Sequence, residues 1–268
     1  MSPELREIVE KAYRLFSDYR PGPSIHCIYD SRKLGAEVEA ALLTLPLREI
    51  PRDLLAQFND DACAYGPRDP WWPYFLPRYF ELVAGYEYPT RLGAESALQC
   101  LAHSGYRKDL PNQQVAVIDR FGIELFTQFI CQPVRCIDPD LLQICYSNHE
   151  DVYNVLRMLV SARIPLPELL GCWDRLTGPD PDLHLADLVN GVYRHTAYGA
   201  NPHFTLFVED AGAILADWLA APQVRRRLEM AFFNTSDERK QAMLSIAEGH
   251  VTRVATLRLS RGGRTSFA

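Results

Sequence analysis

Several side chains have types that could do chemistry, and metal ligands are the first to consider. Cys131 and Cys136 are separated by four residues, but no second pair follows at the spacing of a zinc site. No HExxH pair occurs, and neither a P-loop nor a glycine-rich dinucleotide-binding turn is present. The sequence therefore predicts no metal site and no other cofactor.

A predicted helix from Leu183 to Tyr198 carries His184, Asp187 and His195. Their spacing puts them near one face of the helix. However, His184 and His195 would lie about 16 Å apart along the axis, which is too far to share one ion. We interpret the group as a polar, solvent-facing surface with one hydrogen-bonded histidine. An enzyme whose site is assembled from distant helices, around His184 and His195, is kept as an alternative.

Nucleophilic catalysis would need a base beside a serine or a cysteine. Ser24, His26 and Cys27 lie close together in the sequence PGPSIHCIYD. Adjacent residues of an extended segment point to opposite faces, so His26 is poorly placed to activate Cys27. Neither a GxSxG nor an SxxK motif is present. We therefore predict that the chain is not an enzyme.

What remains is recognition by a surface, and the stretch from Asn59 to Gly85 is the strongest candidate. It combines acids with two adjacent Trp residues and the start of an apolar helix. Tyr and Trp beside acids are typical of binding sites for a basic partner, with core packing as the alternative. A second acidic pair follows Asn148, where a helix N-cap is the alternative. The candidate partner-binding residues are Asp60, Asp61, Asp69, Trp71, Trp72, Glu150 and Asp151.

The charge distribution favours a protein partner over nucleic acid. Residues 251–268 contain four arginines and no acid. Without them, 24 Lys and Arg oppose 34 Asp and Glu, so the rest of the chain carries about −10. Such a body repels nucleic acid and attracts a basic partner, although acidity also simply keeps a protein in solution. We interpret the run Arg225-Arg226-Arg227 as a solvent-facing surface of a predicted helix.

Composition predicts a cytoplasmic protein with a substantial core. The hydrophobic fraction is 47%, yet no apolar run reaches the length of about 18 residues that a membrane span needs. The N-terminal segment lacks the order of charges and apolar residues of a signal peptide. Seven cysteines at scattered spacing indicate free thiols in a reducing compartment.

Hydrophobic periodicity predicts an all-α fold of about a dozen helices, arranged as an irregular bundle or a solenoid-like stack. In the helix that starts at Pro73, the residues expected in the core are Phe75, Leu76, Phe80, Leu82 and Val83. The predicted helices span residues 3–18, 37–43, 52–65, 73–84, 93–105, 111–131, 140–146, 150–162, 166–176, 183–198, 205–220, 222–233 and 237–248.

The sequence also suggests how these helices are divided into domains. We expect two packed halves, residues 1–131 and 140–250, because Pro133 and Pro139 interrupt the helical pattern between them. A single compact unit is the alternative. Residues 251–268 are predicted to be a flexible basic tail, because they end in Gly and Arg.

Three motifs occur in a fixed order: TLPLREIP at residues 44–51, then NDDACAYG, then FLPRYFELVAG. This order resembles a group of bacterial helical proteins with the signature TPLRxLP…FLPRxLELLA. The resemblance covers about residues 24–131 and is looser beyond them. It implies an immunity protein, which binds a cognate toxin in the cytoplasm and occludes the toxin's active site. A helical scaffold or adaptor in a larger assembly is the alternative.

Overall fold

The computed structural model describes residues 1–25, 34–62, 70–146, 150–194 and 210–262. Over these ranges the fold is all-α, as predicted, and the only strand-type pairing is an isolated antiparallel bridge between Ile137 and Ile144. Every helix in this part of the chain falls short of the length or the hydrophobicity that crossing a membrane requires. The helices are α1 (Pro3–Leu15), α2 (Ala36–Thr44), α3 (Arg52–Gln57), α4 (Leu76–Ala84), α5 (Gln99–His103), α6 (Tyr106–Asp109), α7 (Asn112–Ile130), α8 (Val152–Ser161), α9 (Leu166–Arg175), α10 (Pro179–Arg194), α11 (Ala211–Leu219), α12 (Pro222–Phe233) and α13 (Glu238–Gly262).

The chain forms two units. Unit 1 consists of residues 1–128 and 154–165, and unit 2 consists of residues 129–153 and 166–268. Both α7 and α8 therefore contribute residues to each unit. This division differs from the two halves expected from the sequence, because the chain enters unit 2, returns to unit 1 and leaves it again.

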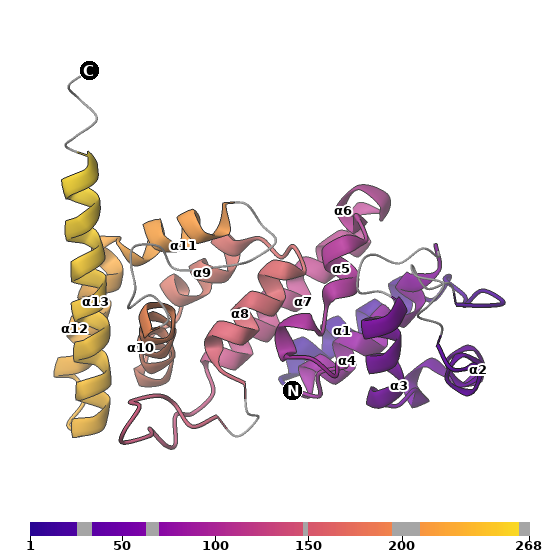
Figure 1. Cartoon of the computed structure of the whole chain (residues 1–268), viewed down its shortest axis with the longest axis horizontal. Coiled ribbons are helices and arrows are strands. Elements are labelled where there is room, and N and C mark those ends of the chain that lie inside the picture. Colours follow the sequence, from indigo (N-terminus) through magenta and orange to yellow (C-terminus); the bar gives the residue numbers. More distant parts are fainter. Residues whose placement is uncertain (26–33, 63–69, 147–149, 195–209, 263–268) are drawn as a thin grey trace. The chain divides into compact units, whose positions relative to one another are not determined.

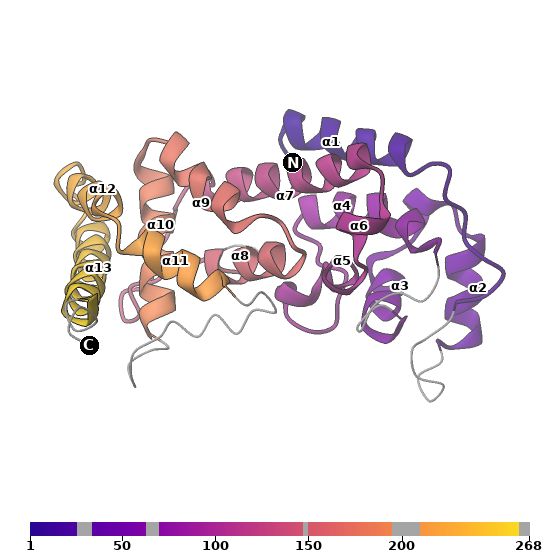
Figure 2. The same cartoon turned by 90° about the horizontal axis from the view of Figure 1, so that it is seen from above.

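Unit 1 is built around α1, α4 and α7. Ser2 caps α1, since its hydroxyl accepts a hydrogen bond from the N–H of Leu5 at 3.1 Å. The apolar side of α1 packs against α4 (Figures 1 and 2). Phe80 of α4 stacks on Phe121 of α7, with 4.0 Å between the ring centroids. The five residues predicted to be in the core of this segment are all buried: Phe75, Leu76, Phe80, Leu82 and Val83.

Unit 2 is built around α10, α12 and α13, which pack against one another (Figure 1). Pro222 opens α12, a position where its missing N–H leaves no hydrogen bond unmade. Helix α9 packs against α11, where the rings of Trp173 and Trp218 lie 5.5 Å apart. The buried apolar side chains between these helices include Leu185, Val189, Leu228, Leu244 and Ala247.

The helix predicted at residues 140–146 is wrong. The carboxylate of Asp138 accepts hydrogen bonds from the N–H groups of Asp140 and Leu141, at 2.9 and 2.8 Å. Leu142 then adopts a positive φ of 49°, which turns the chain back. A turn therefore replaces the first helical residues, and the segment closes on itself through the bridge between Ile137 and Ile144.

The last helix is longer than predicted. It was expected to end near Glu248, but α13 continues to Gly262. Val251, which was assigned to the flexible tail, is 1% exposed and belongs to the core. Packing therefore outweighs the low helix propensity of its β-branched residues. The end of the predicted tail, residues 263–268, lies outside the described residues.

Candidate functional site

A pocket of about 670 Å³ lies in unit 2, between the turn from α9 to α10 and the facing surfaces of α12 and α13. The turn exists because α9 ends at Arg175 and Gly178 adopts a φ of 128°, which residues with a side chain rarely do. Pro179 then opens α10. The pocket is thus formed by two segments that are about fifty residues apart in the sequence.

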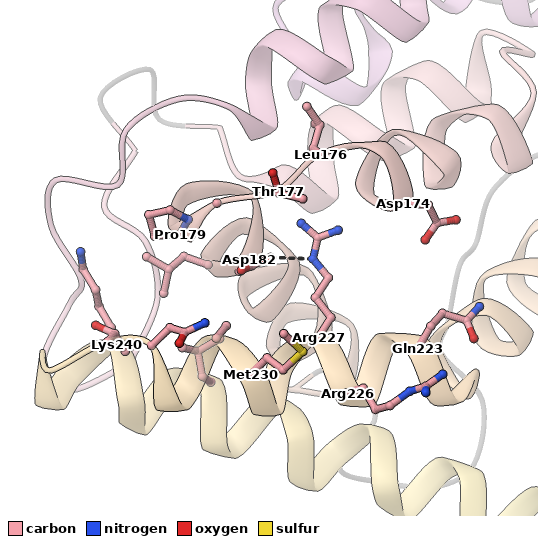
Figure 3. Close-up of a pocket in the computed structure, with 16 residues that line it drawn as sticks. Asp174, Leu176, Thr177, Pro179, Asp182, Gln223, Arg226, Arg227, Met230 and Lys240 are labelled. Atoms are coloured by element: carbon pink, nitrogen blue, oxygen red, sulfur yellow. Dashed lines mark hydrogen bonds and ion pairs between the residues drawn. The ribbon is translucent and has the colours of Figure 1, made fainter.

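Polar side chains lie at both ends of this pocket, and its middle combines apolar side chains with the ion pair of Arg227 and Asp182 (Figure 3). Lys240 lies at one end, Arg226 and Gln223 lie at the other, and Met230 lies between them (Figure 3). Three basic and two acidic side chains line the pocket, so its lining carries a net charge of +1 within a chain of net charge −6. The pocket suits a group that presents an apolar side chain between polar neighbours.

One wall of the pocket is held by Arg227 of α12. Its Nε lies 2.6 Å from Oδ1 of Asp182, and its Nη1 donates to the carbonyl oxygen of Trp173. Burial raises the pKa of Asp182, while the neighbouring guanidinium acts in the opposite direction. These bonds tie α12 to both α9 and α10. Arg227 was predicted to face solvent with its two neighbours, and this prediction is wrong.

Large apolar side chains are exposed beside the pocket. Met230 is 64% exposed and Phe233, one turn further along α12, is 75% exposed. Together with Arg226, these side chains give unit 2 a surface of the composition that protein interfaces favour.

Asp60, a predicted binding residue, is buried in unit 1 and is 8% exposed. Its carboxylate accepts hydrogen bonds from Asn59 at 3.1 Å, from the hydroxyl of Thr90 at 3.0 Å and from the main-chain N–H of Arg91 at 2.8 Å. The Nε of Arg91 adds a fourth bond at 3.2 Å. Asp60 therefore holds the segment around Arg91 in place. Its assignment to a binding surface stays a prediction.

The neighbouring predicted residues are more accessible. Asp61 is half-buried and lies 3.0 Å from Nη2 of the same Arg91. Trp71 is half-buried and packs edge-on against Phe75, whereas Trp72 is 9% exposed and belongs to the core. Of the predicted residues described in unit 1, Asp61 and Trp71 are the ones that offer side-chain surface to a partner.

The other predicted residues lie elsewhere. Glu150 and Asp151 are half-buried in unit 2 and precede the first residue of α8, where acids complement the helix dipole. Asp151 also lines a cavity of about 200 Å³, together with Gln143, Ile144, Tyr146 and Asp187. Asp69 lies outside the described residues. The predicted binding residues are thus divided between the two units.

Asp187 belongs to a buried polar network with Tyr146 and His184. His184 is 1% exposed and Asp187 is 5% exposed, so the prediction that they face solvent is wrong. The hydroxyl of Tyr146 donates to Oδ2 of Asp187 at 2.8 Å, and its oxygen lies 3.1 Å from Nδ1 of His184. His195, the third member of the predicted group, lies outside the described residues.

The protonation of this network follows from its partners. Nε2 of His184 lies 3.0 Å from the carbonyl oxygen of Gln132, and a carbonyl only accepts hydrogen bonds, so Nε2 carries the proton. Burial lowers the pKa of His184, and the Gln132 carbonyl opposes this shift. Burial and the charge of Asp187 raise the pKa of Tyr146. These shifts favour the neutral imidazole and the neutral phenol, and Nδ1 of His184 and Oδ2 of Asp187 then share the single hydroxyl proton of Tyr146.

Sequence reasoning missed the pocket of unit 2 because its residues come from separate segments. The one usable signal was the break after Arg175, where Gly178 and Pro179 end one helix and start another. The comparisons add nothing to this geometry: neither models of protein families, nor curated proteins, nor solved structures gave a match to the chain.

Proposed function

We propose that this chain is a non-catalytic binding protein of the immunity type, which binds a toxin protein and covers the toxin's active site. The proposal has two parts with different support. Protein binding is supported by the surface of unit 2. The toxin as partner is supported by the resemblance of residues 24–131 to bacterial immunity-associated helical proteins.

The observation that carries the first part is the exposure of Met230 and Phe233 beside an open pocket. They are 64% and 75% exposed and lie three residues apart on α12, so they are neighbours on the helix surface. A single exposed apolar side chain is normal, but large ones that gather beside a pocket indicate an interaction site. Met, Phe and Arg are also enriched in protein interfaces.

Acidic side chains contribute to this function by attracting the partner. The chain carries a net charge of −6, and Asp61, Glu150 and Asp151 are half-buried rather than fully enclosed. A partner that carries basic residues around the contact would be attracted to these acids over a distance of about one Debye length, or about 10 Å at moderate salt. In this proposal the acids speed the encounter, and the pocket of unit 2 provides the contact.

The test is co-expression of the chain with toxins encoded beside it, followed by growth measurement and pull-down. We expect growth to be restored and the toxin to be retained, and Met230→Glu to weaken retention at least tenfold because it places a charge in the contact. The matched control is Leu92→Glu, which alters a side chain that is 65% exposed in unit 1. Retention of another protein without any protection from a toxin would identify a scaffold instead.

A further inference from the structure

Two cysteines of unit 2 lie opposite each other on a short hairpin. Ile137 and Ile144 form its antiparallel bridge. The N–H of Cys145 donates to the carbonyl oxygen of Cys136 at 3.0 Å, one position outside that bridge. In this register Cys136 and Cys145 form the next pair of directly opposed residues.

The two thiols point to the solvent side of the hairpin. Successive side chains along a strand point to opposite faces. Ile137 and Ile144 are 5% and 8% exposed, so their face of the hairpin is covered. Cys136 and Cys145 are both free and exposed, as expected for the opposite face. A small molecule in solution can therefore reach both sulfur atoms.

The spacing of this pair fits a disulfide. Directly opposed residues of a hydrogen-bonded antiparallel pair have Cα atoms about 5.5 Å apart. Disulfides join Cα atoms at about 4.4–6.8 Å, and the expected spacing of this pair lies within that range. The neighbouring thiol also affects the protonation of Cys145: hydrogen bonding to Cys136 is the main cause that raises the pKa of Cys145, with smaller contributions from burial and from the charges of Cys136 and Asp138.

We propose that Cys136 and Cys145 are a reversible disulfide site that small-molecule disulfides oxidise. The thiolate of Cys136 attacks one sulfur of the oxidant, which releases one small thiol and leaves a mixed disulfide on Cys136. Cys145 then loses its proton to solvent and attacks the Cys136 sulfur, and the second small thiol leaves. Two protein thiols are oxidised, and one small disulfide is reduced to two thiols.

Such a site can act as a switch in a reducing compartment, where disulfides are transient and often sense redox conditions. The bond would close the ten-residue hairpin covalently. Tyr146 follows Cys145 directly and binds Asp187 at 2.8 Å, so the hairpin is already anchored in unit 2 by that hydrogen bond. We expect the oxidised chain to melt a few degrees higher than the reduced chain, because the bond restricts the unfolded state.

The other described cysteines define the competing products. Cys131 is exposed and lies five positions before Cys136, so it is the alternative partner. Cys100 and Cys172 are buried, and burial raises the pKa of Cys100 to about 12, so both are protected. Cys27 and Cys63 lie outside the described residues. The test must therefore identify the bond and not only the loss of thiols.

The experiment treats the purified full chain with oxidised glutathione and then maps its peptides by mass spectrometry without reduction. We expect the mass to fall by about 2 Da through the loss of two hydrogen atoms, the peptides of Cys136 and Cys145 to be linked, and dithiothreitol to reverse both changes. Cys131→Ser should oxidise like the parent chain. Cys136→Ser and Cys145→Ser should instead retain a glutathione adduct on the remaining cysteine of the pair, and their melting temperature should not rise.

Two results would overturn the proposal. One is a link between Cys131 and Cys136 as the main product in the parent chain. The other is oxidation that yields only disulfide-bonded dimers or stable glutathione adducts, with no internal bond. Because the thiols are exposed, the Ser variants should keep the fold, and circular dichroism of each reduced variant verifies this.

Discussion

Arg91 binds two carboxylates in unit 1, one of which is buried while the other is partly exposed. Asp60 accepts hydrogen bonds from the main chain and the Nε of Arg91, and it is buried. Asp61 meets Nη2 of the same residue, with 30% of its side chain exposed. Water can replace the partner of Asp61 but not those of Asp60. Replacing Asp by Asn should therefore change the free energy of unfolding by different amounts at these two adjacent positions.

Asp60→Asn is expected to lower the free energy of unfolding by about 1–3 kcal/mol, because the new amide donor faces the donor groups of Thr90 and Arg91 inside the protein. Asp61→Asn is the matched control and should change it by less than about 1 kcal/mol, as for other exposed pairs. Urea unfolding of both variants measures this. Equal effects at the two positions would contradict the role assigned to Asp60.

His184 should make stability depend on pH in one direction. Burial lowers its pKa from the ordinary value of 6.5, so the unfolded chain binds a proton more readily than the folded chain. The stabilisation is therefore complete above about pH 6.5 and is lost as the pH falls from there toward the folded pKa. Comparing urea unfolding at about pH 7.5 and about pH 5.5, we expect His184→Gln to reduce the pH dependence, by at most about 1.4 kcal/mol per pH unit.

His103→Gln is the comparison for that measurement. Burial and Arg163 also lower the pKa of His103, but its side chain lies in an exposed position, so a smaller change in slope is expected. If His184→Gln leaves the pH dependence unchanged, the imidazole is not buried in its neutral form.

The residues of the candidate site were only partly predictable from the sequence. The sequence alone indicates that Glu150 and Asp151 stand at the start of a helix, because an N-terminal cap involves only neighbouring residues. The burial of His184 could not be predicted, because its hydrogen-bond partners Tyr146 and Gln132 are 38 and 52 positions away in the sequence. The sequence predicts Asp60 to be a surface acid, because no neighbouring residue indicates its contact with Arg91, which lies 31 positions further on.

At the scale of elements, α7 contains a glycine whose position is set by close packing. A Cβ on Gly122 would lie 2.7 Å from a side-chain carbon of Ile164. We expect Gly122→Ala to destabilise the protein by about 1–3 kcal/mol, as overpacking does. In an Ile164→Ala background, which lacks all three side-chain atoms that the new Cβ would approach, Gly122→Ala should cost less than it does in the parent chain in urea unfolding.

Gly191 of α10 is the matched control. A Cβ there would meet nothing within 4 Å, and the position lies inside a helix. Gly191→Ala should stabilise the protein by about 0.5–1 kcal/mol, because alanine loses less conformational freedom. Destabilisation by Gly191→Ala would show that the position is crowded.

The elements with strong local signals were predicted well. The predicted range 222–233 coincides with α12, where Pro222 starts the helix and Asn234 follows its end. Residues 140–146 were missed because the turn depends on the carboxylate of Asp138, which lies outside the apolar pattern. The length of α13 was missed because its core contacts, such as Val251, compensate for β-branched residues.

At the scale of the molecule, residues 154–165 complete unit 1. Gly122 packs against Ile164, and Arg107 donates to the carbonyl oxygen of Arg163 at 2.6 Å. The segment contributes seven buried apolar side chains: Val155, Leu156, Met158, Leu159, Val160, Ala162 and Ile164. At about 1.5–3 kcal/mol for each large one, their burial rivals the whole stability of a typical domain.

A fragment of residues 1–131 is therefore expected not to fold cooperatively, whereas residues 1–165 should. Circular dichroism during urea unfolding distinguishes them: the longer fragment should show one sigmoidal transition, and the shorter one a gradual change. If both unfold in the same cooperative way, unit 1 does not need the segment 154–165.

The chain passes between its two units three times, and this order has a consequence for biosynthesis. Domains fold as units while the chain emerges from the ribosome, beginning with the N-terminal one. Here residue 165 must be released before unit 1 is complete, and residues 129–153 emerge before any helix of their own unit exists. The nascent chain therefore exposes the apolar surface of an unfinished first unit for longer than a simple two-domain order would, and it should depend on chaperones during that interval.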